Sequence, residues 1–253
     1  MISSRRIFRV ALLAIAGLFV LALHDVGLTD VSRLERGIQN LGTFISEMFP
    51  PEMDVLSELW RALLETIEIA FVGTILGFLV ALPLALLATG SLAPPIVTST
   101  VKLVLAMVRT IPSILWAIIF VVAVGLGPAA GALGIGMYTA GFLGKNLYEL
   151  FEGVDNEVIE AVRGVGGGRA QLARWALLPE ATNGIISQLL FMFEYNVRAS
   201  SILGFVGAGG IGFYLLGYVQ LLEYRSLLTA ILVTLCAVLV IDRASAQLRS
   251  ALR

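Results

Sequence analysis

Six stretches of this sequence are long and apolar enough to cross a lipid bilayer. They lie at about residues 7–23, 62–88, 97–124, 128–150, 181–203 and 226–241. An α-helix rises about 1.5 Å per residue and satisfies its own backbone hydrogen bonds, so about 20 apolar residues span the hydrocarbon core. Of the 253 residues, 58% are hydrophobic and only 14% are charged, too few polar residues to cover a water-soluble domain of this size. The sequence therefore predicts an all-α membrane protein with six transmembrane helices.

The basic residues predict how these helices are oriented, because arginine and lysine near span ends are retained in the cytoplasm. With six spans, three arginine groups fall on one side: Arg5, Arg6 and Arg9; Arg163, Arg169 and Arg174; and Arg243, Arg249 and Arg253. The acidic segment 24–59 and the uncharged "GLGPAAG" turn fall on the other. We expect both termini to be cytoplasmic in a prokaryotic inner membrane. A twin-arginine export signal in "SRRIFRV" is the alternative for the first span, but no clean cleavage site follows it.

Several functional classes are disfavoured by composition. The net charge of −1 leaves no basic patch for nucleic acid, and Cys236 can form no internal disulfide. His24 has no cluster of metal-ligand residues around it, so no metal site is expected. No phosphate-binding loop occurs, since "GFLGKN" at residues 141–146 has the wrong spacing and ends in asparagine. We expect no cofactor on this chain.

The stretch "EAVRGVGGGRAQLARWALLPE", residues 160–180, interrupts the apolar runs. In an arbitrary membrane protein such a loop is a simple connector, but here Gly166 stands at its seventh position and Leu178-Pro179 at its nineteenth and twentieth. This spacing resembles the cytoplasmic EAA loop of the transmembrane subunits of binding-protein-dependent ABC importers. Val162 and Ala176 depart from that pattern, in place of its third alanine and its isoleucine.

The resemblance implies a coupling loop at about residues 153–179, with a short coupling helix at about 155–165. Glycine suits the turn that follows, and proline is tolerated at the start of the next helix. The residues implied to couple the permease to an ATPase are Glu160, Ala161, Arg163, Gly166, Leu178 and Pro179. The implied partners are a second copy of the chain, two ATPase subunits that bind ATP and Mg, and an external binding protein; the chain itself would do no chemistry.

Residues 60–253 resemble the five-span core of smaller importers of this class, and 1–59 would add an N-terminal helix and an external acidic segment. The segments "VRTIPSILWAIIFV" and "FEYNVRASSILGFVGAGGIGFYLLGY" look most like permeases of the phosphonate-uptake (PhnE) family. That likeness implies import of phosphonate, phosphite, phosphate or a related phosphorus oxyanion. Methionine-type permeases share the layout and remain an alternative. An ion-coupled secondary transporter and a purely structural scaffold are the rivals from other classes; no internal repeat supports the first.

Ionisable residues inside the spans normally face a partner or a water-filled cavity. Glu194 and Arg198 are four residues apart on one helix face, where they can pair. Pro112 is expected to break or kink the third span. The candidate pathway residues are Arg109, Pro112, Lys145, Asn146, Glu194, Asn196 and Arg198. The alternative is structural: a Glu194–Arg198 pair, with Arg109 and Lys145 reaching toward headgroups. Glu65 and Glu68 are expected at the outer interface.

The segment "GAGGIG", residues 207–212, matches a dinucleotide-binding pattern but lies in a membrane context without the required strand. We interpret it as a gate or hinge at the external end of the fifth span. The glycines concerned are Gly207, Gly209, Gly210 and Gly212. Close helix packing is the alternative, since small residues let membrane helices approach. Packing is the interpretation that we favour for Gly73 and Gly77.

Overall fold

A computed structural model describes residues 4–251, and every regular element in that range is helical. The chain divides into two compact units, Met1–Pro50 and Pro51–Arg253. The first unit contains α1 (Ser4–Asp25), which is apolar, and α2 (Val31–Glu47). Asp30 caps α2, because its carboxylate accepts the Ser32 hydroxyl at 2.7 Å and the Arg33 backbone N–H at 3.0 Å. These hydrogen bonds, that of Ser32 first, lower the pKa of Asp30.

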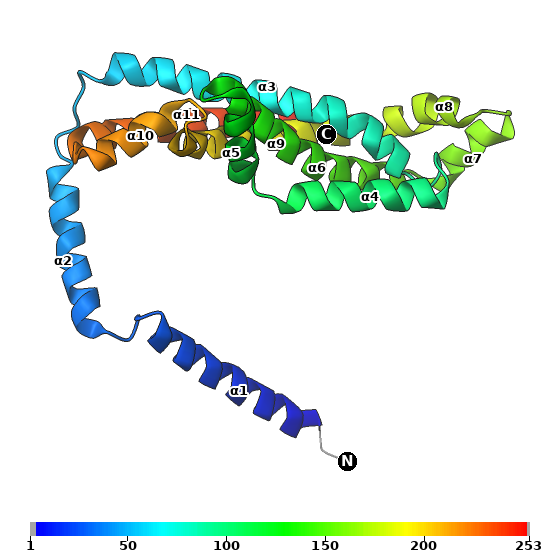
Figure 1. Ribbon diagram of the computed structural model, residues 1–253. Helices are drawn as coiled ribbons and strands as arrows, with labels where there is room; N and C mark the ends of the chain where they lie inside the picture. Colours follow the sequence, from blue (N-terminus) through cyan, green and yellow to red (C-terminus); the bar gives the residue numbers. More distant parts are fainter. Residues whose placement is uncertain (1–3, 252–253) are drawn as a thin grey trace. The chain divides into compact units, whose positions relative to one another are not determined.

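The second unit is a bundle of lengthwise helices. Its long members are α3 (Leu56–Ala88), α6 (Pro128–Glu152), α9 (Leu178–Leu203) and α11 (Tyr224–Ala251). Figure 1 shows α7 (Asn156–Gly164) and α8 (Arg169–Leu172) at one end of this unit and α10 (Ile211–Gln220) at the other. The bundle therefore has two distinct ends: one carries α7 and α8 of the segment 153–179, which we call the coupling segment, and the other carries α10.

The predicted third span is two helices rather than one. It consists of α4 (Pro95–Thr110) and α5 (Ser113–Val124), which meet at an angle of 87°. Pro112 lies at the break, as expected, because proline donates no backbone N–H and its ring clashes with a continuing helix. By length and apolar composition, three described helical runs can cross a bilayer: α3, Arg169–Val206 and α11; the bent pair would be a fourth.

Glycines let α3 and α6 approach closely. A Cβ atom added to Gly73 would lie 2.5 Å from Cγ2 of Ile135, and one added to Gly77 would lie 2.5 Å from Cβ of Thr139. Real Cβ atoms do not pack at such distances, so alanine at either position would push the helices apart. The packing interpretation of Gly73 and Gly77 is confirmed.

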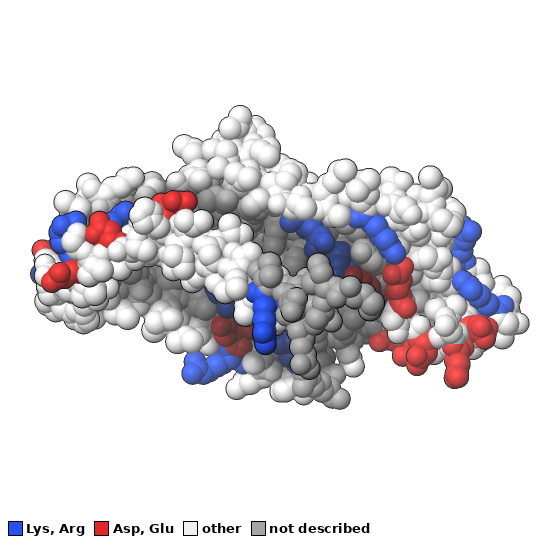
Figure 2. All heavy atoms as spheres, turned by 90° about the horizontal axis from the view of Figure 1, so that it is seen from below, with Lys and Arg blue, Asp and Glu red and all other residues white. Residues whose placement is uncertain are grey.

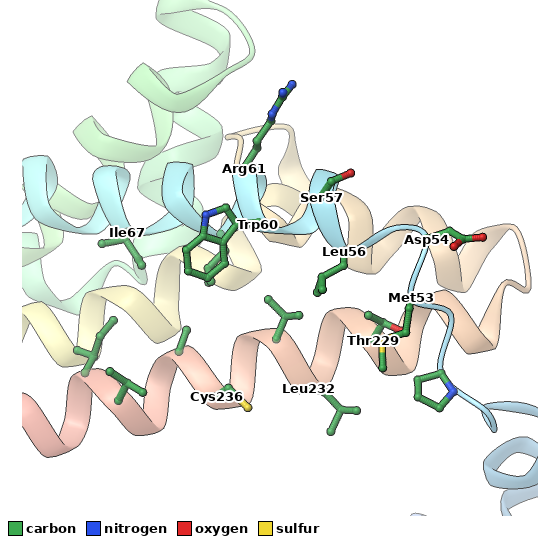
Figure 3. A pocket seen from close by; sticks show the side chains of 16 residues that line it. Met53, Asp54, Leu56, Ser57, Trp60, Arg61, Ile67, Thr229, Leu232 and Cys236 are labelled. Carbon is green, nitrogen blue, oxygen red and sulfur yellow. The ribbon is translucent and has the colours of Figure 1, made fainter.

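An apolar groove of about 1070 Å³ runs between the start of α3 and α11. Figure 3 shows Trp60 and Ile67 on its α3 side and Leu232 and Cys236 on its α11 side. The lining also includes Asp54 and Arg61, and the Arg61 side chain points away from α11 in this view.

Candidate functional site

The short helix expected at about residues 155–165 is α7 (Asn156–Gly164). Ile159 anchors it, because this side chain is buried in one apolar cluster with Phe151, Leu172 and Leu177. Glu160 and the next residue along the helix are exposed. The helix is thus fixed to the bundle by one face and presents the other, which carries Glu160, outward.

Gly166 ends this helix in a left-handed conformation, with φ of +82°. Its N–H donates to the carbonyl of Arg163, and the N–H of Gly167 donates to the carbonyl of Val162, both at 2.9 Å. This pair of bonds is the Schellman motif, in which glycine at the first position beyond the cap avoids the penalty that a Cβ atom would incur. No atom lies within 4 Å of a Cβ added to Gly166, so the requirement for glycine there is conformational rather than steric.

The helix that leads into the fifth span begins earlier than predicted. It starts at Arg169, with a π-helical turn at Ala173–Leu177 that joins α8 to α9. The N–H of Leu178 donates to the carbonyl of Ala173, five residues earlier. The widened turn accommodates Pro179, which cannot donate to the helix, so the Leu-Pro lies within a continuous helical run instead of starting it.

The predicted side-chain pair Glu194–Arg198 is wrong. Both Glu194 oxygens accept from the Arg249 guanidinium at 3.1 Å, and Arg198 lies 3.4 Å from Asp242. Arg198 reaches only the backbone carbonyl of Glu194, at 3.3 Å. The reason is tertiary: α11 packs along α9 and brings opposite charges to both residues. Glu194 is buried, so its bidentate partner compensates a charge that lipid would reject.

Asn196 joins three helices. It is fully buried, and its amide nitrogen donates to the hydroxyls of Thr74 on α3 and Thr139 on α6, at 2.8 and 2.9 Å. Its Oδ1 atom has no hydrogen-bond partner among the described residues. This geometry favours a structural role for Asn196, since interhelical hydrogen bonds hold membrane helices together.

The remaining candidate pathway residues differ in whether their side chains already have a partner. Lys145 forms an ion pair with Glu149 at 2.6 Å, and Asn146 donates to Gln188 at 3.0 Å. Arg109 is exposed at the end of α4, beside the break, and forms no ion pair with any residue that the structure describes. Of the predicted pathway charges, Arg109 is therefore the one most available to an anion.

A strip of aromatic rings, which sequence reasoning missed, joins α6 and α9. Tyr138 stacks on Phe142 and Tyr195, and Phe142 stacks on Phe191, with centroids 5.8 to 6.4 Å apart. Phe191 and Tyr195 remain exposed, at 44% and 40%. The signal was available as two aromatic pairs with i, i+4 spacing, one on each helix. We call these four residues the aromatic strip.

The glycine segment forms an irregular connection between α9 and α10. Gly207, Gly209 and Gly210 all have φ between +78° and +83°, the left-handed region that favours glycine. Close packing applies to all four glycines, Gly212 included, since an added Cβ would lie 2.3 to 2.6 Å from a neighbouring atom at each position. The close-packing alternative is therefore supported, and a role of the segment as a gate or hinge stays a prediction.

Two residues of α3 hold this segment in place. The Glu65 carboxylate accepts the Gly210 N–H at 3.0 Å, and the Thr66 hydroxyl oxygen accepts the Ile211 N–H at 2.7 Å. Glu65 is therefore a half-buried contact of the glycine segment, and its expected position at the outer interface stays a prediction. The N–H groups at a helix start lack intrahelical partners, which explains why a carboxylate and a hydroxyl are recruited there.

Charged side chains gather at the coupling end of the second unit. Figure 2 shows basic and acidic groups at the end that carries α7 in Figure 1. Other charged groups lie at the opposite end and between the two ends.

Comparison with known proteins places this arrangement in a family. Residues 73–253 match the model of the binding-protein-dependent transport system inner membrane component. The chain is 35% identical over 234 residues to the phosphite transport system permease protein PtxC of Stutzerimonas stutzeri, covering 92% of this chain and 85% of that one. It is 34% identical to the phosphate-import permease protein PhnE of Mycolicibacterium smegmatis, covering 84% of this chain and 40% of that one.

A solved structure of the MetNI methionine ABC transporter in an inward-facing conformation has the same fold. Its TM-score is 0.72 at 25% identity, covering 80% of this chain and 99% of that one. The helical bundle, the exposed short helix with its Schellman turn, the matched family model and these relatives lead to one conclusion. The chain belongs to the binding-protein-dependent inner membrane components, as a type I ABC importer permease of the PhnE family, a transport component that is not itself an ATPase.

Proposed function

We propose that this chain lines the translocation pathway of an ATP-driven importer for phosphorus oxyanions such as phosphite, phosphonate or phosphate. The substrate class is supported by the names of the relatives, which cover most of this chain. The observation that carries the importer mechanism is α7, a short helix held by Ile159 and presenting Glu160 outward. A separate ATPase binds this face, and an external binding protein delivers the solute.

The active assembly has two copies of this chain and two ATPase subunits. Each permease offers one coupling helix, so two copies are needed to engage two motors. ATP and Mg are bound by the ATPase subunits, and this chain needs no cofactor of its own. It crosses the inner membrane six times with both termini in the cytoplasm. The five-helix core occupies residues 60–253, and residues 1–59 add an N-terminal helix and an external acidic segment.

Coupling works through the continuous helical run Arg169–Val206. Its start packs in the same apolar cluster as α7, through Leu172 and Leu177. Its far end adjoins the glycines in left-handed conformation. There, Glu65 and Thr66 of α3 accept hydrogen bonds from the backbone N–H groups of Gly210 and Ile211. Movement of α7 by the motor therefore tilts a rigid rod whose other end turns about the glycine segment. The residues that receive the movement of the ATPase are Glu160, Ala161, Arg163 and Gly166. The helical turn around Leu178 and Pro179 transmits this movement to the rest of the run.

The pathway wall includes Arg109 and the aromatic strip. Arg109 offers an unneutralised guanidinium, and arginine forks match the oxygens of a phosphorus oxyanion. In the aromatic strip, Tyr138 and Tyr195 can supply hydroxyl donors beside it. Lys145, Glu194 and Arg198 are already paired in the structure, which supports a structural role for them.

The experiment is solute uptake into proteoliposomes that contain the full complex with ATP inside. Phosphite, a phosphonate and phosphate are compared with methionine. ATP-dependent uptake of a phosphorus oxyanion, reduced at least tenfold by Arg109→Glu in a complex that still assembles, is the expected result. Uptake of methionine alone, or uptake that survives without ATP and fails with an uncoupler, would contradict the proposal.

A further inference from the structure

A polar cavity of about 380 Å³ lies between the α3–α4 turn and the coupling segment. Its lining includes Gly90 and Ser91 from the turn, and Arg163, Gly168 and Arg169 from the coupling segment. We call this cavity the arginine pocket. It is separate from the outward face of α7 that carries Glu160 and from the aromatic strip.

The arginine pocket has a net positive charge that no acidic residue balances. Two guanidinium groups line it, and no carboxylate occurs among the described residues of the lining. The acidic side chain nearest to Gly90 is that of Glu152, which Lys102 already holds in an ion pair at 2.7 Å. Arg169 makes no ion pair and no side-chain hydrogen bond with any residue in the described range 4–251. One guanidinium is therefore uncompensated.

The other polar groups of the arginine pocket also favour an anion. Arg163 donates one bond, from Nη2 to the Ser91 carbonyl at 3.2 Å, which leaves most of its five N–H groups available. The Ser91 hydroxyl is buried and has no partner among the described residues. A buried hydroxyl without a partner is costly, and rotation of the Ser91 side chain toward the cavity would let it donate to a ligand oxygen. Donors thus converge on this cavity from two separate segments of the chain.

We infer that the arginine pocket binds a phosphate-type oxyanion. Two arginines and a hydroxyl supply the forked, charge-assisted donors that a tetrahedral oxyanion with several acceptor oxygens satisfies best. The oxyanion is either free inorganic phosphate or the phosphate of a lipid headgroup. A headgroup is a possible source because the pocket lies beside the turn between the end of α3 and the start of α4. The bound ion bridges the α3–α4 turn to the coupling segment and stiffens the base of α7. This inference does not require that the chain transport any solute.

The test uses the full chain in nanodiscs of phosphatidylcholine, without the ATPase or the binding protein. Binding of radiolabelled inorganic phosphate is measured for the wild type, Arg169→Gln and Arg174→Gln. Arg174 is the matched control, because it lies five residues along the chain, rests on the Trp175 ring at 5.3 Å and does not line the pocket. A second arm uses phosphatidylglycerol nanodiscs and measures, by native mass spectrometry, the lipid that stays bound. Arg169 is exposed, so its substitution leaves folding intact, which an unchanged unfolding temperature verifies.

Saturable phosphate binding that Arg169→Gln weakens at least tenfold, and Arg174→Gln leaves unchanged, is the result expected for free phosphate. Loss of retained phosphatidylglycerol in Arg169→Gln alone, without phosphate binding, supports the inference with a lipid headgroup as the source. Equal effects of Arg169→Gln and Arg174→Gln in both arms would overturn it. Phosphate binding that Arg109→Gln removes and Arg169→Gln does not would also overturn it, since the ion would then lie in the pathway.

Discussion

Removal of Arg249 is expected to destabilise the bundle strongly, because this side chain is the ion-pair partner of a buried carboxylate. The Glu194 side chain is only 7% exposed and accepts two hydrogen bonds from Arg249 at 3.1 Å. Breaking a buried pair by deleting one partner costs about 3–5 kcal/mol, chiefly because the remaining charge is left uncompensated. Arg249 is itself 30% exposed, so water screens part of the interaction and the lower end, about 3 kcal/mol, applies.

At about 2–4 °C per kcal/mol for a chain of this size, Arg249→Met should lower the unfolding temperature by roughly 6–12 °C. The assay is thermal unfolding of the purified chain in detergent, followed by tryptophan fluorescence. The matched control is Arg243→Met, on the same helix, because Arg243 is exposed and pairs with no described residue. The double variant Glu194→Gln/Arg249→Met should recover most of the loss, since no buried charge then remains. A shift for Arg249→Met no larger than that for Arg243→Met would refute this reasoning.

Three further outcomes are expected. Gly166→Val should uncouple ATP hydrolysis from transport, because a β-branched residue is strained at φ of +82°. Gly166→Asn should retain most of the coupling, because asparagine tolerates the left-handed conformation. Equal transport activity in the two variants would contradict the left-handed turn. Gly73→Ala should destabilise the chain by about 1–3 kcal/mol in detergent unfolding, whereas Gly217→Ala, with no atom within 4 Å of the added Cβ, should not destabilise it. Glu65→Ala should raise the rate of hydrogen exchange at the Gly210 amide at least tenfold. Glu65→Gln should raise it much less, because glutamine still accepts the hydrogen bond. An unchanged exchange rate in Glu65→Ala would show that this bond does not hold the segment.

Local features of the fold were predictable because local physics determines them. Long apolar runs can only be helical in lipid, Pro112 cannot continue a helix, and the glycine at 166 marks a left-handed turn. Each of these predictions depends on a few neighbouring residues. The structure therefore has helices, a break and a turn at the expected places.

Partners between helices were not predictable in the same way. The sequence places Glu194 and Arg198 on one helix face, but packing of α11 against α9 decides that Glu194 binds Arg249 instead. The start of the helix at Arg169 was also missed. Proline normally marks a helix boundary, but here a π-helical turn accommodates Pro179 within the helix. Both differences arise from geometry that no short motif encodes.

The central claim is that α7 couples this permease to an ATPase that responds to a loaded binding protein. The most direct measurement is ATP hydrolysis by the full complex in liposomes, with and without the binding protein and a phosphorus oxyanion. Glu160→Lys is compared with Glu157→Lys, which reverses an exposed charge on the same helix but outside the motif. The account predicts stimulation that needs both binding protein and solute, persists in Glu157→Lys and is lost in Glu160→Lys although the complex assembles. Full stimulation in Glu160→Lys, or a wild-type chain that binds no ATPase, would contradict it.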